Sequence, residues 1–175
     1  MYLRFNVGFK TMVIWLLGIS GSGKSTLGLL LKEYFKKQNK STIFIDGDDF
    51  RDFFDNDLGF SITQRRENIK RIIGAAFIAT QENSVVIVCN ISPFQDLRDF
   101  CRRKLSGYFE VFLDREIFSA VKADVKGVYE SSNNIDVVGN DILFDIPVKA
   151  DLIINTDKLT IEEAFVSLIS AIKIL

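Results

Sequence analysis

Short runs of hydrophobic residues alternate along the chain with longer segments in which hydrophobic positions follow a helical spacing. Continuous short runs are typical of strands buried on both faces, and the longer periodic segments are typical of amphipathic helices. Strands are predicted at 13–17, 41–46, 84–90, 108–114 and 150–156. Helices are predicted at 24–38, from 61 onward, from 93 to 104 and from 160 to about 174. The alternation predicts a parallel sheet that is covered by helices on both faces.

Local signals at three helix starts support this order. Ser61 with Gln64 and Thr160 with Glu163 have the spacing of capping boxes, and Pro93 fits the first turn of a helix. At 175 residues the chain has the length of a single domain, 1–175, in which residues 1–11 are expected to form an N-terminal extension. We therefore expect an α/β fold, a three-layer sandwich around a mostly parallel, five-stranded sheet.

Composition excludes several classes of protein. Hydrophobic residues make up 47% of the chain and the formal net charge is −1, which indicates neither a disordered chain, a nucleic-acid-binding protein nor a membrane protein. The chain contains no histidine, so histidine-based acid–base catalysis and histidine-ligated metal sites are excluded. Cys89 lies in a hydrophobic run, as expected for a buried, reduced thiol in a cytoplasmic protein.

A phosphate-binding loop joins the first predicted strand to the first predicted helix. The stretch "GISGSGKS" has a glycine, four residues and then Gly-Lys-Ser, which is the pattern of a P-loop. Glycines let backbone N–H groups surround a polyphosphate, the lysine reaches its terminal phosphates and the serine hydroxyl ligates Mg²⁺. ATP and Mg²⁺ are therefore predicted, in a fold of the P-loop NTPase type. The predicted ATP phosphate-binding residues are Gly18, Ser20, Gly21, Ser22, Gly23, Lys24, Ser25 and Thr26.

Among P-loop proteins, the chain length and the missing motifs favour a small-molecule kinase. A GTPase switch needs an Asn-Lys-x-Asp motif, and the chain offers only "NTDK", at 155–158, in the wrong order. The stretch "DVVG" at 136–139 has the form of the Asp-x-x-Gly switch motif, but it lies too late in the chain. A non-catalytic nucleotide-binding sensor is the alternative from another class, and such a protein needs only the P-loop.

The second predicted strand ends in the acidic stretch "DGDDFR". Because the carboxyl ends of parallel strands form the mouth of the sheet, Asp46 and Asp48 are expected to face the transferred phosphate. Phosphoryl transfer needs organised Mg²⁺ and a carboxylate that accepts the proton of the acceptor hydroxyl. We predict that Lys24, Asp48 as base and Asp46 as a ligand of Mg²⁺ through water form the catalytic set. In a simpler interpretation these two acids are turn residues or a helix cap. Asp49 is expected to be the N-cap or a first-turn acid of the next short helix.

Polar and aromatic residues that follow this stretch suit an anionic nucleotide acceptor. Arg65 and Asn68 lie three positions apart on a predicted helix, so they share a face. The guanidinium forks of Arg51 and Arg65 suit a phosphate or an anhydride. Phe60 is the phenylalanine that we expect to stack on the base of a substrate.

In order, the motifs "GISGSGKST", "DGDDFR", "LGFSITQRRENIKR", "ISPF" and "DVKGVY" resemble the adenylylsulfate kinases over residues 12–130. The resemblance implies ATP-dependent phosphorylation of the ribose 3′-hydroxyl of a 5′-nucleotide conjugate, and it is compatible with a homodimer. Ser92 is expected to contact the acceptor, or, in a simpler interpretation, to cap the helix that starts at Pro93. The residues implied to bind the acceptor are Asp48, Arg51, Phe60, Arg65, Asn68, Ile91, Ser92, Lys126 and Val137.

The sequence departs from this family within residues 115–150, which are expected to form a mobile lid over the site. Ala123 replaces an arginine, and Lys122 or Lys126 is the predicted substitute for its charge over the phosphates. Val137 stands where a stacking phenylalanine is usual, and "ESSN" replaces a basic run. We interpret these changes as a changed acceptor, cytidine diphosphoramidate, as in an adenylylsulfate-kinase-like enzyme of phosphoramidate capsule modification. The alternative acceptor is adenylylsulfate.

Overall fold

The computed structural model describes residues 11–122, 137–139 and 141–173. Its strands are β1 (Met12–Leu17), β2 (Thr42–Asp46), β3 (Val85–Cys89), β4 (Tyr108–Asp114) and β5 (Leu152–Asn155). Its helices are α1 (Lys24–Lys37), α2 (Gly47–Phe53), α3 (Ile62–Ala79), α4 (Gln95–Lys104), α5 (Ile117–Lys122) and α6 (Ile161–Ile172). Every predicted strand and helix therefore occurs, and α5 is an additional short helix.

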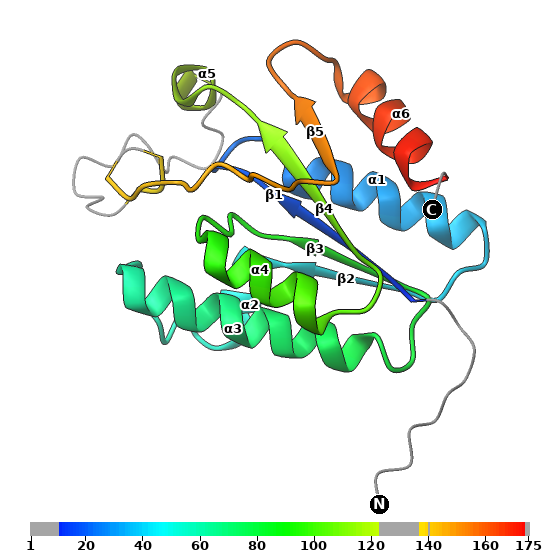
Figure 1. The fold of residues 1–175 in the computed structure, drawn as a ribbon, viewed down its shortest axis with the longest axis horizontal. Helices are drawn as coiled ribbons and strands as arrows, with labels where there is room; N and C mark the ends of the chain where they lie inside the picture. Colours follow the sequence, from blue (N-terminus) through cyan, green and yellow to red (C-terminus); the bar gives the residue numbers. More distant parts are fainter. Residues whose placement is uncertain (1–10, 123–136, 140, 174–175) are drawn as a thin grey trace, which may run out of the picture.

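The strands form one sheet, all parallel, in the order β2-β3-β1-β4-β5. Helices α1 and α6 pack together on one face of the sheet, and α3 and α4 pack together on the other (Figure 1). The predicted three-layer α/β sandwich is thus confirmed. Because β1 is the central strand, the P-loop that follows it lies between the ends of β2 and β3 on one side and the ends of β4 and β5 on the other.

The side chains on the two faces of β1 contribute to two separate hydrophobic cores. Val13, Trp15 and Leu17 belong to the core beneath α3 and α4. Ile14 and Leu16 belong to the core beneath α1 and α6. All of these side chains are fully buried, and burial of each stabilises the fold by about 1.5–3 kcal/mol. The continuous hydrophobic run of β1 thus reflects a strand that is covered on both faces.

Helix α1 approaches the sheet closely at Gly28. A Cβ atom at Gly28 would lie 2.4 Å from the Cys89 Sγ atom and 2.7 Å from the Phe44 ring. Cys89 is buried with a free thiol, as predicted, and this thiol donates a hydrogen bond of 3.2 Å to the carbonyl oxygen of Lys24. Burial raises the pKa of the Cys89 thiol, which suits a packing role. The start of α1 is therefore held against β3.

The two predicted capping boxes differ in completeness. Thr160 and Glu163 exchange both side chain–backbone hydrogen bonds at the start of α6. At the start of α3, the Ser61 hydroxyl accepts from the Gln64 backbone N–H, but the Gln64 side chain contacts the Ser61 hydroxyl rather than its backbone. Both residue pairs nevertheless mark the first turn of a helix, as the sequence pattern predicted.

The predicted position of Pro93 in the first turn of a helix is wrong. Helix α4 begins at Gln95, and the preceding Ser92 has a φ of 49°, outside the helical region. The Pro93 carbonyl oxygen accepts a hydrogen bond of 2.9 Å from the Asp145 backbone N–H. A tertiary contact with a distant segment therefore holds this stretch out of the helix.

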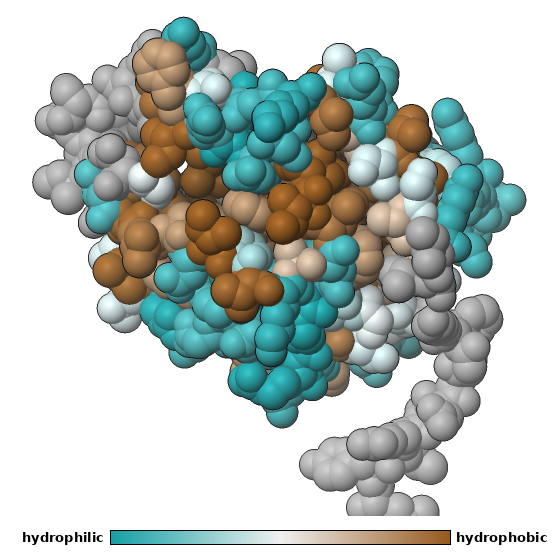
Figure 2. Space-filling view, turned by 45° about the horizontal axis from the view of Figure 1, so that its top comes forward, coloured by the Kyte–Doolittle hydropathy of each residue, from teal (hydrophilic) through white to brown (hydrophobic). Residues whose placement is uncertain are grey.

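None of the helices in the described part of the chain is long and apolar enough to cross a membrane. Hydrophobic residues do reach the surface, where Figure 2 shows them across the middle of one face, between two hydrophilic regions. The most exposed large ones include Phe53, Leu143 and Val148. Exposed hydrophobic side chains of this kind are common on folded domains and indicate no particular partner.

Candidate active site

The carboxyl ends of the strands open into a pocket of about 810 Å³, the usual place for a ligand in a parallel α/β sheet. Among the described residues, every predicted site residue except Gly18 lines this pocket. Lys126 lies outside the described residues. Residues predicted from motifs that are far apart in the sequence therefore come together in one place.

The P-loop has the backbone conformation that a phosphate cradle needs. Gly18 has a φ of 148°, and a Cβ atom there would lie 2.5 Å from the Leu113 carbonyl oxygen. Gly23, which precedes α1, is left-handed with a φ of 93°. The Lys24 Nζ atom donates to the carbonyl oxygens of Gly18, at 3.0 Å, and Ile19, at 2.7 Å. The lysine side chain thus folds back over the P-loop backbone.

One carboxylate connects the P-loop to the end of β2. The Asp46 Oδ2 atom accepts a hydrogen bond of 2.5 Å from the Ser25 hydroxyl, and its Oδ1 atom accepts one of 2.9 Å from the Asp48 backbone N–H. Asp46 is therefore also the N-cap of α2, as the simpler interpretation had it.

The oxygen donors of Ser25 and Asp46 fit Mg²⁺, which prefers oxygen ligands and usually keeps waters and substrate phosphates around it. The described part of the chain contains no group of three or more His, Cys, Asp or Glu residues that could hold a metal ion by itself. Ser25 and Asp46 are thus the residues that would hold Mg²⁺ beside substrate phosphates and water.

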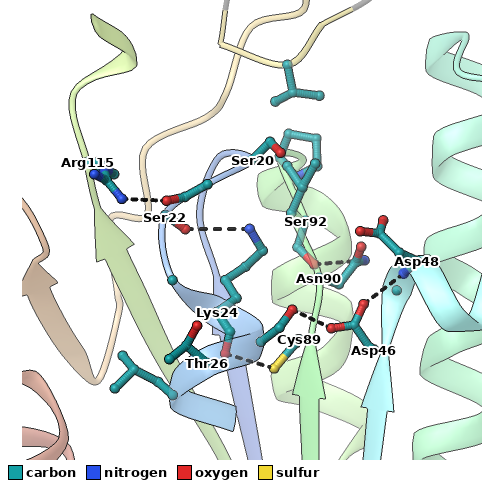
Figure 3. Close-up of a pocket in the computed structure, with 18 of the residues that line it drawn as sticks. Ser20, Ser22, Lys24, Thr26, Asp46, Asp48, Cys89, Asn90, Ser92 and Arg115 are labelled. Atoms are coloured by element: carbon teal, nitrogen blue, oxygen red, sulfur yellow. Dashed lines mark hydrogen bonds between the residues drawn. The ribbon is translucent and has the colours of Figure 1, made fainter. Parts of the chain in front are cut away.

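Asp48 lies in the first turn of α2 and is exposed to the pocket. Figure 3 shows Asp46 and Asp48 on one side of Lys24 and Arg115 on the other. The predicted base therefore stands beside the predicted metal ligand, on the side of the P-loop where β2 ends.

Arg51 and Arg65 place their guanidinium groups near the ring of Phe60, 4.8 Å and 5.1 Å from its centroid. Both arginines also bond the backbone around this residue: Arg51 donates to the Leu58 and Gly59 carbonyls, and Arg65 donates to the Phe60 carbonyl. Phe60 itself is 55% exposed. Burial lowers the pKa of the Arg51 guanidinium, and the Asp48 carboxylate partly offsets this. The pocket thus presents an accessible aromatic ring with two cations beside it.

Two further predicted residues lie on the same side of the pocket. Asn68 comes from α3 and is 4% exposed, and Ile91 follows β3. Asn68 therefore offers a buried amide to whatever occupies this side of the pocket. Arg65 and Asn68 lie on the same helix and both line the pocket, as their spacing predicted.

Ser92 is not a helix cap, so the simpler interpretation of this residue is wrong. Its hydroxyl accepts hydrogen bonds from the Trp15 Nε1 atom, at 2.9 Å, and from the Asn90 Nδ2 atom, at 3.2 Å. Its carbonyl oxygen accepts one of 2.8 Å from Arg98. Ser92 lines the pocket but is only 2% exposed. These contacts fix the loop after β3 against the central strand.

The residues at which the expected lid departs from the family, and the lysines proposed to replace its arginine, have different positions. Val137 is 9% exposed and lines the pocket, as predicted. Lys122 does not line the pocket, because its Nζ atom lies 4.4 Å from the Phe118 ring centroid on the exposed side of α5. Ala123 and Lys126 lie outside the described residues. Of the two predicted substitutes for the missing arginine, Lys122 is thus not in position.

The sequence analysis missed pocket residues that follow β3, β4 and β5. They are Asn90, Pro93, Arg115, Val138, Thr156, Leu159, Thr160, Ile161 and Ala164. A signal was present, since Asn90 and Thr156 are the last residues of predicted strands and Arg115 directly follows another, where side chains of a parallel sheet face its mouth. Only the end of β2 was predicted to face the pocket on this ground.

Comparisons with known proteins agree with this geometry. Residues 10–155 match the family model described as adenylylsulphate kinase. An adenylyl-sulfate kinase of Bacillus pumilus is 33% identical over 169 residues, 94% of this chain and 86% of the relative. A cytidine diphosphoramidate kinase of Campylobacter jejuni is 39% identical over 150 residues, 82% of this chain and 85% of the relative. The Mycobacterium tuberculosis APS kinase solved with AMPPNP and APS superimposes with a TM-score of 0.86 at 28% identity, covering 94% of this chain and 98% of that one.

These relatives confirm the P-loop α/β fold and the predicted class of enzyme, an ATP-dependent kinase whose acceptor is a hydroxyl group. They favour adenylylsulfate over the cytidine conjugate that the sequence analysis preferred, since adenylylsulfate kinases recur among them. The match covers most of the chain and includes the P-loop and both sides of the pocket. The chain belongs to the adenylylsulfate kinase family.

Proposed function

We propose that the chain transfers the γ-phosphoryl group of ATP to the ribose 3′-hydroxyl of adenylylsulfate. The observation that carries this proposal is the Phe60 ring with Arg51 and Arg65 beside it, in the same pocket as the P-loop and Asp48. An aromatic face suits a nucleobase, and paired guanidinium forks suit the charged anhydride of the acceptor. The expected lid, the homodimer and the cytoplasmic location are parts of the same proposal.

The P-loop binds the donor through its backbone N–H groups and the start of α1. Lys24, whose ammonium group lies at the Gly18 and Ile19 carbonyls of the P-loop, binds the β- and γ-phosphates. Ser25 and Asp46 would hold Mg²⁺, Asp46 through water, and this ion would offset charge on the phosphates. The donor is thereby fixed with its γ-phosphate toward the end of β2.

Asp48 then acts on the acceptor. Its carboxylate accepts the proton of the 3′-hydroxyl as that oxygen forms a bond to the γ-phosphorus and the bond to the ADP oxygen breaks. ADP leaves with the bonding electron pair. Phe60, Arg51, Arg65 and Asn68 hold the acceptor so that its 3′-hydroxyl meets the γ-phosphate in line, which is the positioning that this reaction mainly requires.

A second acceptor, cytidine diphosphoramidate, is supported by one observation in the pocket. Val137 lines it where the family usually has a phenylalanine, and stacking on a base is worth about 1–3 kcal/mol. A valine offers less stacking area than a phenylalanine does. A pyrimidine, which is smaller than a purine, depends less on this area. The Campylobacter jejuni relative is a kinase of that conjugate by name. We keep this acceptor as the second candidate.

The test is ADP release by the purified protein with adenylylsulfate, with cytidine diphosphoramidate and with neither, followed by the mass of each product. We expect turnover with adenylylsulfate and a product heavier by one phosphoryl group, and no turnover when the 3′-hydroxyl is replaced by hydrogen. Efficient turnover of the cytidine conjugate alone would assign the second acceptor. Binding of ATP without phosphorylation of either conjugate would favour the non-catalytic sensor.

Two variants test whether residues of this pocket account for the measured turnover. Lys24→Ala should abolish turnover of every acceptor, because it removes the positive charge that stabilises the transferred phosphoryl group. Val137→Phe should raise the ratio of adenylylsulfate to cytidine diphosphoramidate turnover, since it adds stacking area for a purine. A ratio that Val137→Phe leaves unchanged would remove this residue from the choice of base.

A further inference from the structure

Arg115 occupies the side of the pocket that the sequence analysis left unassigned. It directly follows Asp114, the last residue of β4, and its side chain is 22% exposed. Figure 3 shows it across Lys24 from Asp46 and Asp48. The reaction as proposed so far gives this side chain no role.

The guanidinium group of Arg115 is held in place but keeps donors available. Its NH1 atom donates a hydrogen bond of 2.6 Å to the Gly21 carbonyl oxygen in the P-loop. Its Nε atom lies 3.5 Å from the Asp157 carboxylate, which in turn accepts the Glu116 backbone N–H at 2.7 Å. Neither Nε nor NH2 has a hydrogen-bond partner among the described residues. An arginine offers five N–H donors in a fixed fork, and Nε is buried beside Asp157, so the second NH1 proton and the two NH2 protons are the donors that a ligand could reach.

The strand order decides which ligand Arg115 can reach. Arg51, Phe60 and Asp48 follow β2, on one side of the P-loop, whereas Arg115 follows β4 on the other side. Transfer in line requires the γ-phosphate to face the acceptor. The rest of the donor must then extend past the P-loop toward β4 and β5, where Leu159, Ile161 and Ala164 offer apolar contacts.

The positively charged side chains that line the described part of the pocket are unevenly distributed. The lysine and arginine side chains that line the pocket in the described part of the chain are Lys24, Arg51, Arg65 and Arg115. Arg51 and Arg65 lie at Phe60 on the acceptor side. Lys122, one of the two candidates to replace the missing lid arginine, lies at Phe118 instead. Arg115 is thus the described pocket cation on the β4 side.

We propose that Arg115 pairs with the α- and β-phosphates of the donor nucleotide, so that the end of β4 supplies charge that Ala123 cannot. The assignment rests on the proposed use of ATP and does not depend on which acceptor is used. Charge-assisted hydrogen bonds from a guanidinium fork to phosphate are among the stronger polar contacts in proteins. In contrast to a cation on a lid, this one is attached to the sheet and to the P-loop itself.

The experiment measures binding without an acceptor. Isothermal titration calorimetry with Mg²⁺–AMPPNP and with Mg²⁺–ADP would compare the wild type with Arg115→Met, Arg115→Gln and Arg115→Lys. Arg103→Met, an exposed arginine on α4 outside the pocket, is the matched control. We expect Arg115→Met and Arg115→Gln to weaken both nucleotides by roughly tenfold or more, Arg115→Lys to retain most of the affinity, and Arg103→Met to have no effect.

Two readouts separate phosphate binding from mere bracing of the loop. The difference between the wild type and Arg115→Met should shrink as salt is raised, because it arises from charge. The KM for the acceptor should not change. Wild-type affinity in Arg115→Met, a difference that salt does not alter, or a variant that binds poorly because its melting temperature has collapsed would each overturn the assignment. A wild type that binds neither nucleotide would instead overturn the use of ATP, and this assignment with it.

Discussion

The Ser25 hydroxyl donates a hydrogen bond of 2.5 Å to the Asp46 carboxylate, although the two residues lie 21 positions apart in the sequence. This contact joins the start of α1 to the end of β2. It brings the two predicted ligands of Mg²⁺ together. The predicted metal site therefore depends on the parallel arrangement of β1 and β2 on either side of β3.

The first prediction concerns this pair. Asp46→Asn and Ser25→Ala should each raise the Mg²⁺ concentration needed for half-maximal ADP release, by about 10–100-fold, as loss of a ligand or its support does elsewhere. Asparagine still caps a helix well, so α2 should persist in Asp46→Asn. In the double variant, the loss of Mg²⁺ binding free energy should be smaller than the sum of the losses in the two single variants, because each change already breaks the shared contact. Additive losses in a Mg²⁺ titration would contradict a common site.

The second prediction concerns the base. Asp48→Asn should lower kcat by about 10²–10⁴-fold with little effect on ATP binding, because the proton of the acceptor loses its recipient. Asp49→Asn is the matched control, since Asp49 lies next in α2 but does not line the pocket. Single-turnover ADP release measures the effect. Near-normal turnover of Asp48→Asn would remove this residue from the role of base.

The third prediction compares two glycines in helices. Gly28→Ala should destabilise the fold by about 1–3 kcal/mol, because its Cβ atom would meet Cys89 and Phe44. Gly74→Ala should stabilise it by about 0.4–1 kcal/mol, because a Cβ atom there meets nothing within 4 Å and the unfolded chain loses freedom. Urea denaturation monitored by circular dichroism gives both values. Equal effects at the two positions would contradict the close approach of α1 to the sheet.

The fourth prediction concerns pH. The Arg66 side chain bonds Asp96 and holds the pKa of that carboxyl below its ordinary value of 3.8. A lowered pKa in the folded state means that the pair contributes stability above the ordinary pKa and loses it as pH falls through the lowered one. Because both side chains are partly exposed, solvent limits this contribution to about 1 kcal/mol or less. Asp96→Asn should therefore be slightly less stable than the wild type at pH 7 and equally stable once the pH falls below the lowered pKa of Asp96.

Thermal unfolding of Asp96→Asn and the wild type across this range is the measurement. Added salt at pH 7 should shrink the difference, since the pair is accessible to ions. A difference that persists unchanged into strong acid would show that packing, not the ion pair, accounts for it.

Much of the fold and half of the site could be predicted from the chain alone. The run Val13–Leu17 and the glycine pattern after it specify a buried strand and a P-loop, because these are local requirements of packing and backbone geometry. The stretch that contains Asp46 and Asp48 was predicted to face the phosphate because carboxyl ends of parallel strands meet at one edge. The same rule, applied to every strand, would also have found Asn90 and Arg115.

Other features depended on contacts between segments that no local pattern encodes. Ser92 lines the pocket but does not cap a helix, and the Trp15 indole and Arg98 donate hydrogen bonds to its oxygen atoms. Lys122 was a candidate to bind the phosphates, but its side chain lies over the Phe118 ring of α5.

By itself, then, the sequence determined the order of strands and helices, the P-loop and the acidic end of β2, since each follows from residues close together in the chain. The tertiary structure alone decided that β1 would be central, with the acceptor groups on its β2 side and Arg115 on its β4 side. It also decided which polar atoms remain available to a ligand and which are used internally. Both depend on strand order and on long-range packing, where distant residues compete for the same partners.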